Sequence, residues 1–344
     1  MPNNNGTVLR LALPSKGALE KSTMDFFANA GLRVNKPNER QYSATIPSAP
    51  GVEILFQRVT DIFDKVADGS VDLGVTGFDV VSEETEEGDD VVVVQQLGFG
   101  RCELVLAVPE SWVDIASLAE LADLATTYKE KGRELRIATK YSNLTRTWLY
   151  ERGLTYFSLV GADGALEVAP SMGYADMIVD ITSSGTTLRE NRLKMLTGGT
   201  LLKSEAVLIG NRRTLLESQE KLQQTRLILE LIEAHLRARK FVSITANIKG
   251  ESQEAVARLL AQEPKLAGLM GPSITPVYVK ARGEGDSQAY AVTVVVERDV
   301  LLPTIDHLRK QQGTDITVIA PDYVFDSKSW SFENLVELLK RQRR

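Results

Sequence analysis

The sequence has one cysteine and only two histidines in 344 residues. A lone cysteine, Cys102, excludes an intramolecular disulfide and a cysteine-based zinc site. His235 and His307 both stand in charged segments with a helical pattern, so we expect exposed helix residues there rather than catalytic groups. A Ser-His-Asp or Cys-His mechanism is therefore disfavoured. Any chemistry must use carboxylates, cations, backbone donors or a metal.

Long apolar runs and an excess of positive charge are also missing. No apolar run is long enough to cross a bilayer, and the first residues show no signal-peptide pattern. The formal net charge of −6 gives no electrostatic footprint for nucleic acid, despite a short basic run at 340–344. With 43% hydrophobic and 25% charged residues, the composition is that of a globular protein. We expect a cytoplasmic protein without nucleic-acid or membrane partners.

Strand and helix patterns alternate over the first two-thirds of the chain, which favours α/β sheets with parallel strands. The predicted strands are 8–13, 52–57, 72–76, 91–95, 102–108, 135–139, 156–160, 177–180 and 201–209. The predicted helices are 18–30, 61–68, 115–131, 144–152 and 165–172. Two lobes fit this order better than one sheet. We assign 1–103 and 191–211 to lobe I and 104–190 to lobe II, with a ligand cleft between them.

A different pattern begins after a long amphipathic linker helix at 212–239. The predicted elements are a strand (241–247), a helix (252–261), two strands (275–279 and 289–297), a helix (300–312) and a strand (316–319). This βαββαβ order predicts a ferredoxin-like module over 240–324. Such a module more often regulates or oligomerises than catalyses. Residues 325–344 form a C-terminal helical extension that packs on this module or hangs free.

A hydroxyl-rich loop follows the strand that ends at Asp180. It contains Thr182, Ser183, Ser184, Gly185, Thr186 and Thr187. Hydroxyl donors and the free N–H groups of a helix start suit a phosphate, and a glycine allows close backbone approach. Asp180 suits Mg²⁺ or sugar hydroxyls. An ordinary loop with a Ser/Thr N-cap accounts for the same residues about equally well.

Four further clusters end other predicted strands. They are Lys16 with Gly17, Arg58, the glycine-rich run 71–79, and the run 97–102 with Arg101. Arginine and lysine there could neutralise phosphates, and glycines leave room for a flat ligand. Singly, each cluster also fits a solvated loop or a surface ion pair. Their equivalent positions at strand ends point to one cleft.

These runs resemble the ATP phosphoribosyltransferase family in its long form. The matching runs are 11–17, 71–79, 97–102, 137–146 and, most specifically, 164–188. The resemblance implies an α/β fold of two periplasmic-binding-protein-like lobes that form the catalytic cleft, plus a C-terminal ferredoxin-like, ACT-type α+β regulatory domain. It implies transfer of a phosphoribosyl group from phosphoribosyl pyrophosphate to N1 of ATP, with Mg²⁺ as cofactor. This reaction is the first step of L-histidine biosynthesis.

The resemblance also implies residue roles. Phosphoribosyl pyrophosphate would contact Glu167, Asp176, Asp180, Thr182, Ser183, Ser184, Gly185, Thr186 and Thr187. ATP would contact Lys16, Gly17, Arg58, Asp72, Gly74, Thr76, Gly77, Asp79 and Arg101. The catalytic candidates are Asp180, Arg101 and Lys16, and Asp180 is also the candidate metal ligand.

The family further implies feedback inhibition by L-histidine and a homo-oligomer, a hexamer with exchange to dimers. The candidate histidine loop holds Met270, Gly271, Ser273 and Thr275, where a plain Gly-Pro turn also fits. Two other functions stay open. One is a prephenate dehydratase-like enzyme, although Thr147 stands where that enzyme's Thr-Arg-Phe motif has Phe. The other is a non-catalytic anion- or nucleotide-binding sensor, which would bind without turnover.

Overall fold

The computed structural model describes residues 8–36, 38, 41–86, 88–161, 164–263, 265, 268–269, 271–278 and 288–340. The chain forms two compact units. Unit 1 is built from the described residues of Met1–Ala28, Leu32–Leu227 and Ser331–Arg344, and unit 2 from those of Asn29–Gly31 and Ile228–Trp330. Within these ranges, every helix is too short or too polar to span a membrane.

The first sheet of unit 1 has the strand order β2-β3-β1-β4-β11-β5. The strands are β1 (Leu9–Pro14), β2 (Ser43–Thr45), β3 (Val52–Gln57), β4 (Leu73–Gly77), β5 (Val91–Gln96) and β11 (Ala206–Asn211), with helices α1 (Ala18–Asn29), α2 (Val59–Ala67) and α3 (Phe78–Glu84). β1 pairs in parallel with β3 and β4, whereas β11 runs antiparallel to β4 and β5. The carboxyl ends of β1, β3 and β4 therefore meet at one edge of this sheet.

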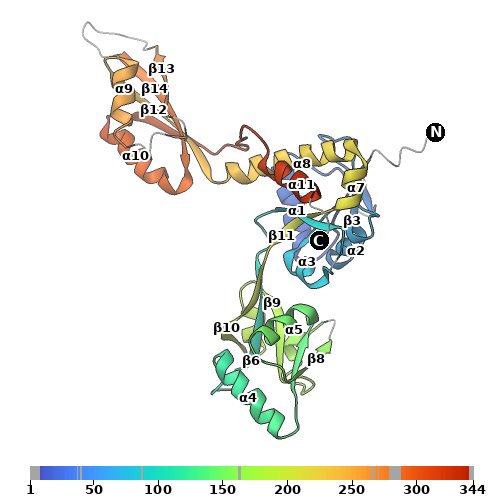
Figure 1. Ribbon diagram of the computed structural model, residues 1–344. Coiled ribbons are helices and arrows are strands. Elements are labelled where there is room, and N and C mark those ends of the chain that lie inside the picture. Colours follow the sequence, from blue (N-terminus) through green and yellow to red (C-terminus); the bar gives the residue numbers. More distant parts are fainter. Residues whose placement is uncertain are drawn as a thin grey trace, which may run out of the picture. The chain divides into compact units, whose positions relative to one another are not determined.

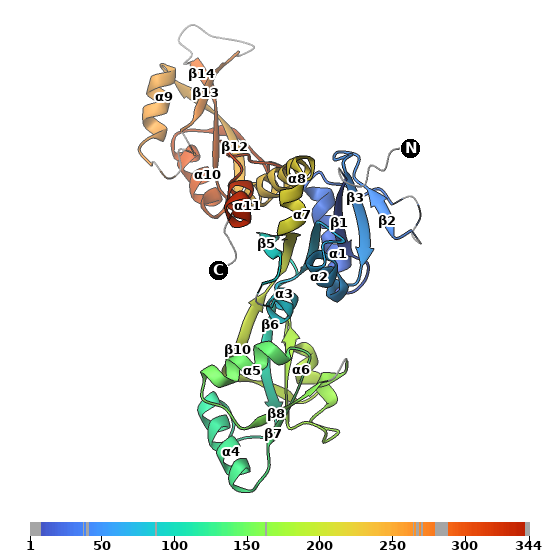
Figure 2. The ribbon, with the colours of Figure 1, turned by 45° about the vertical axis from the view of Figure 1, so that its right-hand side comes forward.

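The second sheet of unit 1 has the order β10-β6-β9-β7-β8. The strands are β6 (Cys102–Pro109), β7 (Leu135–Thr139), β8 (Phe157–Gly161), β9 (Met177–Thr182) and β10 (Leu193–Ser204), with helices α4 (Leu118–Glu130), α5 (Ser142–Glu151) and α6 (Thr186–Glu190) and a 3₁₀ turn η1 (Leu166–Val168). Apolar side chains of the strands and of α4 and α5 form its core. Strands β6 and β10 connect this lobe to the first one (Figures 1 and 2). Both sheets contain the expected parallel pairs together with antiparallel ones, so both are mixed.

Three predictions differ from the structure in the number or type of elements, beyond small shifts of their bounds. The single strand 201–209 is two strands, because β10 ends at Ser204 in the second sheet and β11 starts at Ala206 in the first. The helix 165–172 is only the η1 turn, since Pro170 and the left-handed Gly173 (φ 78°) do not continue a helix.

The predicted linker helix 212–239 is two helices, α7 (Arg212–Glu217) and α8 (Gln219–Ala238). Ser218 between them has an extended backbone (φ −135°, ψ 119°), and its hydroxyl accepts a hydrogen bond from the Lys221 N–H at 3.3 Å. A serine is favoured at such a helix start, because its short side chain satisfies a backbone donor there.

Unit 2 contains the predicted ferredoxin-like module. Its elements are β12 (Phe241–Gly250), α9 (Gln253–Leu260), β13 (Ser273–Val277), β14 (Gln288–Glu297), α10 (Leu301–Lys310) and β15 (Thr314–Ile319). The strand order β13-β14-β12-β15 confirms the βαββαβ topology. His307 on α10 is 7% exposed, and His235 on α8 is half-buried. The expectation of two exposed histidines is therefore wrong, because His307 lies on the buried face of α10 together with Thr304 and Leu308.

The C-terminal helix α11 (Trp330–Lys340) folds with unit 1 from Ser331 onward. Leu335 and Leu339 are buried, the Phe332 ring lies beneath the Arg226 guanidinium, and Arg212 donates to the Leu339 carbonyl at 3.3 Å. From Ser331 onward this helix thus belongs to unit 1 rather than to the ferredoxin-like module. It returns to the α7–α8 region of the first lobe (Figure 1).

Candidate functional site

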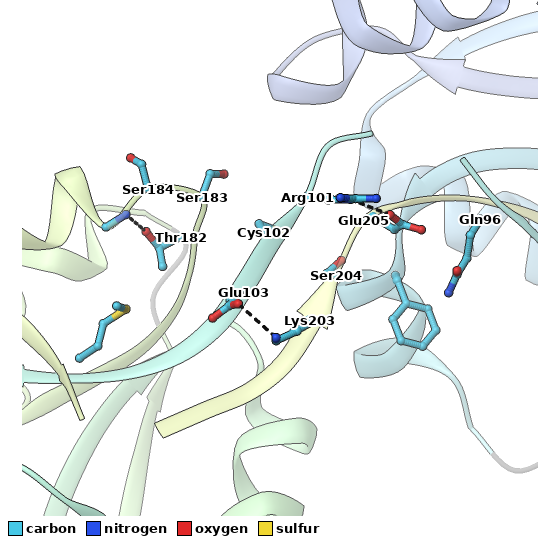
Figure 3. A pocket seen from close by; sticks show the side chains of 13 residues that line it. Gln96, Arg101, Cys102, Glu103, Thr182, Ser183, Ser184, Lys203, Ser204 and Glu205 are labelled. Carbon is cyan, nitrogen blue, oxygen red and sulfur yellow. Dashed lines mark hydrogen bonds and ion pairs between the residues drawn. The ribbon is translucent and has the colours of Figure 1, made fainter. Parts of the chain in front are cut away.

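A cavity of about 780 Å³ lies where the two lobes of unit 1 meet. It is lined by Phe78, Gln96, Arg101, Cys102, Glu103, Thr182, Ser183, Ser184, Gly185, Met195, Lys203, Ser204 and Glu205. In Figure 3 the loop residues Thr182–Ser184 lie on the left, the strands β6 and β10 cross the centre, and Arg101, Glu205 and Gln96 lie on the right. The cavity thus combines a hydroxyl-rich loop with charged side chains of both signs.

The hydroxyl-rich loop joins β9 to α6 and is held by its own side chains. The Gly185 N–H donates to Thr182 Oγ1 at 2.8 Å, and the hydroxyls of Ser184 and Thr186 lie 2.9 Å apart. Gly185 has a left-handed backbone (φ 69°), which only glycine adopts without strain. Arg189 reaches back from α6 and donates to Thr186 Oγ1 at 3.2 Å. A guanidinium therefore stands beside the hydroxyls.

Asp180 lies on β9 two residues before Thr182, so both side chains are on one face of the strand. The pKa of Asp180 is raised to about 6, chiefly by burial and also by the nearby Glu167 carboxylate, against the opposing effects of the Ile181 N–H and the Lys140 charge. The structure therefore brings Glu167, Asp180 and the loop together. Lys140 joins them, because β7 and β9 pair in parallel with Thr139 opposite Val179.

The three side chains predicted to neutralise phosphates lie in two different parts of unit 1. Arg101 lines the cavity with a side chain that is 79% exposed, and its Nε lies 3.3 Å from Glu205. Lys16 and Arg58 are exposed and follow the adjacent parallel strands β1 and β3, where the Ser15 N–H donates to the Gln57 carbonyl at 2.7 Å. Gly17, next to Lys16, has a left-handed backbone (φ 85°).

Asp72 and Asp176 do not reach the cavity. Each precedes its strand, at the amino end of β4 or β9, whereas the loop follows the carboxyl end; along β9 this separates Asp176 from Thr182 by roughly 20 Å. Asp72 accepts hydrogen bonds from the Arg10 N–H and from Lys221 Nζ, both at 2.8 Å.

The Asp176 carboxylate is bound by two arginines. Arg133 and Arg136 both donate to its carboxylate. Burial alone would raise the pKa of Asp176, but the hydrogen bonds and charges of these arginines hold it below its usual range. Both acids, Asp72 and Asp176, have structural partners.

Gly74, Thr76 and Gly77 lie in β4, and all three are buried. A Cβ on Gly74 would stand 2.4 Å from the side chain of Ile62, so this glycine permits close packing of α2 on the sheet. Thr76 donates to the Val59 carbonyl at 3.0 Å. Gly77 ends β4 and precedes α3. These positions shape the lobe rather than open a space for a flat ligand.

Asp79 and Glu83 on α3 are buried and face residues of lobe II. Asp79 accepts hydrogen bonds from the Tyr141 hydroxyl at 2.7 Å and from the Ser204 hydroxyl at 2.6 Å. Glu83 accepts from the backbone N–H groups of Asn143 and Leu144. Asp79 was predicted as an ATP contact, but lobe II and β10 already occupy both of its carboxylate oxygens.

The sequence-based assignment misses several residues in or near the cavity, and five of them bear directly on the proposed chemistry. They are Lys140, Tyr141, Arg189, Glu103 and Lys203. Glu103 and Lys203 face each other across β6 and β10, with Oε1 and Nζ 3.9 Å apart. The run 137–146 already stood out in the sequence, and Arg189 is the first cation after the hydroxyl-rich loop. For Glu103 and Lys203 only the strand pairing reveals the contact.

The described part of the candidate histidine loop comprises Gly271, Ser273 and Thr275, all exposed in or beside β13. Met270 lies outside the described residues. The Ile274 carbonyl between Ser273 and Thr275 accepts a hydrogen bond from Gln253 of α9 at 3.0 Å.

Comparison with known proteins covers nearly the whole chain. A family model described as ATP phosphoribosyltransferase matches residues 58–234, and one described as HisG, C-terminal domain, matches 238–320. "ATP phosphoribosyltransferase 2, chloroplastic" of Arabidopsis thaliana is 40% identical over 328 residues, which are 94% of this chain and 79% of that protein. An ATP phosphoribosyltransferase of Nitrobacter winogradskyi is 36% identical over 97% of this chain and 99% of its own length.

A solved structure shares the fold. A chain of the ATP phosphoribosyl transferase (HisG:HisZ) complex from Thermotoga maritima superposes with a TM-score of 0.51 at 24% identity. The match covers 66% of this chain and 96% of that one.

Proposed function

The chain belongs to the ATP phosphoribosyltransferase family, and on that premise we propose that its interlobe cavity carries out the transfer, with phosphoribosyl pyrophosphate on lobe II and ATP reaching it from lobe I. In this reaction a bond forms between adenine N1 and C1 of the ribose, while the bond from C1 to pyrophosphate breaks. The observation that carries this proposal is the cavity in which the hydroxyl-rich loop faces Arg101. The family match disfavours the prephenate dehydratase-like alternative.

The loop from Thr182 to Thr187 holds the 5′-phosphate of the donor. Its hydroxyls lie at the start of α6, and Arg189 already bonds to one of them. A guanidinium beside several hydroxyl donors binds a phosphate dianion through charge-assisted hydrogen bonds. Gly185 keeps the backbone open to the ligand, since no side chain projects there.

Asp180 and Glu167 bind the ribose hydroxyls of the donor, and with them Mg²⁺. The Glu167 carboxylate acts on Asp180 through space, and two carboxylates plus substrate phosphates are a usual set of Mg²⁺ ligands. Among the described residues no group of three or more acidic, histidine or cysteine side chains could hold a metal alone. The donor set therefore fits a cation that is shared with the substrate, and Mg²⁺ bound there would neutralise the leaving pyrophosphate.

Arg101, Lys16 and Arg58 neutralise the phosphates of pyrophosphate and ATP. Positive charge at a departing pyrophosphate stabilises the transition state directly, because negative charge accumulates on that group as the bond breaks. Of these three residues, Arg101 lines the cavity itself. The transfer needs no nucleophilic side chain, which agrees with the scarcity of histidine and cysteine.

The test combines ATP, phosphoribosyl pyrophosphate and Mg²⁺ and follows the ultraviolet absorbance of the adduct together with pyrophosphate release. We expect both signals from the native protein and a loss of at least a hundredfold in kcat for Asp180→Asn. The matched control is Asp123→Asn, an exposed position on α4, which should keep full activity. Pyrophosphate release without adduct, or binding of both substrates without turnover, would contradict the proposal.

We also propose that L-histidine inhibits the enzyme by binding the module of unit 2 near Gly271, Ser273 and Thr275, and that the protein is a cytoplasmic homo-oligomer. The support is the match of residues 238–320 to the family's C-terminal domain and the exposure of the three residues. Titration with L-histidine during turnover tests the first point. Unchanged activity of the full chain at millimolar histidine would refute it.

A further inference from the structure

Two of the acidic side chains on helix α3 are buried, which is unusual for carboxylates. Asp79 is 6% exposed and Glu83 7%. Residues four apart lie on the same face of a helix, so both acids point in one direction. That direction is toward lobe II and the connecting strand β10, as their hydrogen-bond partners show.

Asp79 joins three elements. The Tyr141 hydroxyl donates to one carboxylate oxygen at 2.7 Å, and the Ser204 hydroxyl donates to the other at 2.6 Å. The Asp79 N–H in turn donates to the Ser204 hydroxyl at 2.9 Å. Burial raises the pKa of Tyr141, and the negative charge of Asp79 raises it further. The phenol therefore stays protonated and remains a donor at neutral pH.

Glu83 caps a helix of the other lobe. Its carboxylate accepts from the backbone N–H groups of Asn143 at 2.8 Å and Leu144 at 2.9 Å, and the Asn143 side chain donates to the Glu83 carbonyl at 3.2 Å. The N-cap residue of α5, Tyr141, provides no side-chain cap of its own. The first donors of α5, which a helix leaves unsatisfied, thus depend on a carboxylate from lobe I.

The elements joined by these bonds adjoin two different parts of the proposed site. Helix α3 begins at Phe78, which lines the cavity, and Tyr141 directly follows Lys140, which acts on Asp180. We propose that Asp79, Glu83 and Tyr141 form an interlobe latch that holds the wall of Phe78 in register with Asp180 and the phosphate loop. Asp79 and Tyr141 are then positioning residues for the transfer rather than ligands of ATP. This inference rests on the proposed function.

The latch has a kinetic consequence that a purely structural contact lacks. The ribose and the 5′-phosphate of phosphoribosyl pyrophosphate bind on lobe II, so most of its affinity does not depend on how the lobes are held. ATP binding needs residues of both lobes. Its apparent affinity is the intrinsic affinity multiplied by the fraction of molecules that have the lobes in register. Loss of one hydrogen bond to a charged acceptor corresponds to about tenfold in such an equilibrium.

The decisive variant is Tyr141→Phe, which removes one hydroxyl and keeps the ring. We expect the KM for ATP to rise about tenfold, kcat to stay within about threefold, and the Kd for phosphoribosyl pyrophosphate, measured by calorimetry, to stay unchanged. Tyr150→Phe on the same helix is the matched control, because Tyr150 is 52% exposed, and it should change none of these values. A lower kcat with an unchanged KM for ATP, or native kinetics throughout, would overturn the proposal, and so would a loss of phosphoribosyl pyrophosphate binding.

Hydrogen exchange supplies a readout that is independent of turnover. The amides of Asn143 and Leu144 should exchange at least several-fold faster in Tyr141→Phe and in Glu83→Gln, with the rest of α5 unaffected. If the native protein makes no adduct, the proposed function fails while this exchange still reports the latch. Unchanged exchange in both variants would refute the latch itself. Glu83→Gln also replaces Tyr141→Phe in the kinetic assay if the latter does not fold.

Discussion

Replacing Asp180 by asparagine should stabilise the substrate-free protein while it removes turnover. Burial raises the pKa of this carboxyl from 3.8 to about 6, a difference of about two units, which corresponds to about 3 kcal/mol against the ionised form. Asparagine is neutral and of the same size, and its carbonyl can still accept the Ile181 N–H, which lies 2.8 Å from Asp180 Oδ1. The substitution therefore removes an electrostatic cost without opening a cavity.

The increase in the free energy of unfolding caused by Asp180→Asn should grow as the pH rises. Below pH 3.8 the carboxyl is protonated in both folded and unfolded chains, so the substitution changes little. Between pH 3.8 and about 6 the unfolded chain loses its proton first, and the cost of the buried carboxylate grows to its full value above that window. We expect Asp180→Asn to raise the free energy of unfolding by up to about 3 kcal/mol at pH 8. Near pH 4 the difference should vanish.

Urea unfolding followed by tryptophan fluorescence measures this difference, because Trp112 and Trp148 both pack in lobe II. A Trp330→Phe background in both proteins confines the signal to that lobe. Asp123→Asn serves again as the exposed control and should show no pH-dependent gain. A destabilised Asp180→Asn protein at pH 8, or a gain that is equal at pH 4 and pH 8, would refute the burial argument.

Three further predictions concern residues that hold the fold. Asp72→Ala should cost about 3–5 kcal/mol, because it leaves Lys221 buried without its partner, and the KM for ATP of the folded fraction should stay native in steady-state assays. Gly74→Ala should cost about 1–3 kcal/mol by overpacking against α2; a raised KM for ATP without destabilisation would instead place this glycine at the nucleotide. Leu335→Ala should lower the free energy of unfolding by about 2–5 kcal/mol, since the side chain is fully buried in unit 1. The control Asn334→Ala changes an exposed residue and should be neutral. Equal effects of the two substitutions in urea melts would show that α11 does not pack on unit 1.

The sequence-based prediction succeeded where an element depends on interactions between residues that are neighbours in the chain. The strands 52–57 and 135–139 have the predicted bounds, because each is a short apolar run between clear breakers. The loop after Asp180 also lies where it was expected, between a strand and a helix. Where local signals compete, the prediction failed, as at Ser218, whose capping preference divides a continuous helical pattern into α7 and α8.

The candidate site was predicted only in part, and strand direction explains the difference. Asp180 lies near the carboxyl end of β9, whereas Asp72 and Asp176 precede β4 and β9. An aspartate therefore stands beside the hydroxyl-rich loop in one case and forms an ion pair in the other two. The order of strand and acid along the chain already distinguishes these cases. Roles for Glu83 and Tyr141 could not be read in this way, because their partners lie about 60 residues away along the chain.

The sequence by itself determined the alternating elements, the ferredoxin-like module and the hydroxyl-rich loop, since each depends on patterns within a few residues. Its two histidines and single cysteine also disfavoured a Ser-His-Asp or Cys-His mechanism. The tertiary structure decided which acids face the cavity, that β10 and β11 belong to different sheets, and that α11 returns to unit 1. Such outcomes depend on pairing between distant segments, where burial and hydrogen bonding are satisfied only after the chain has folded.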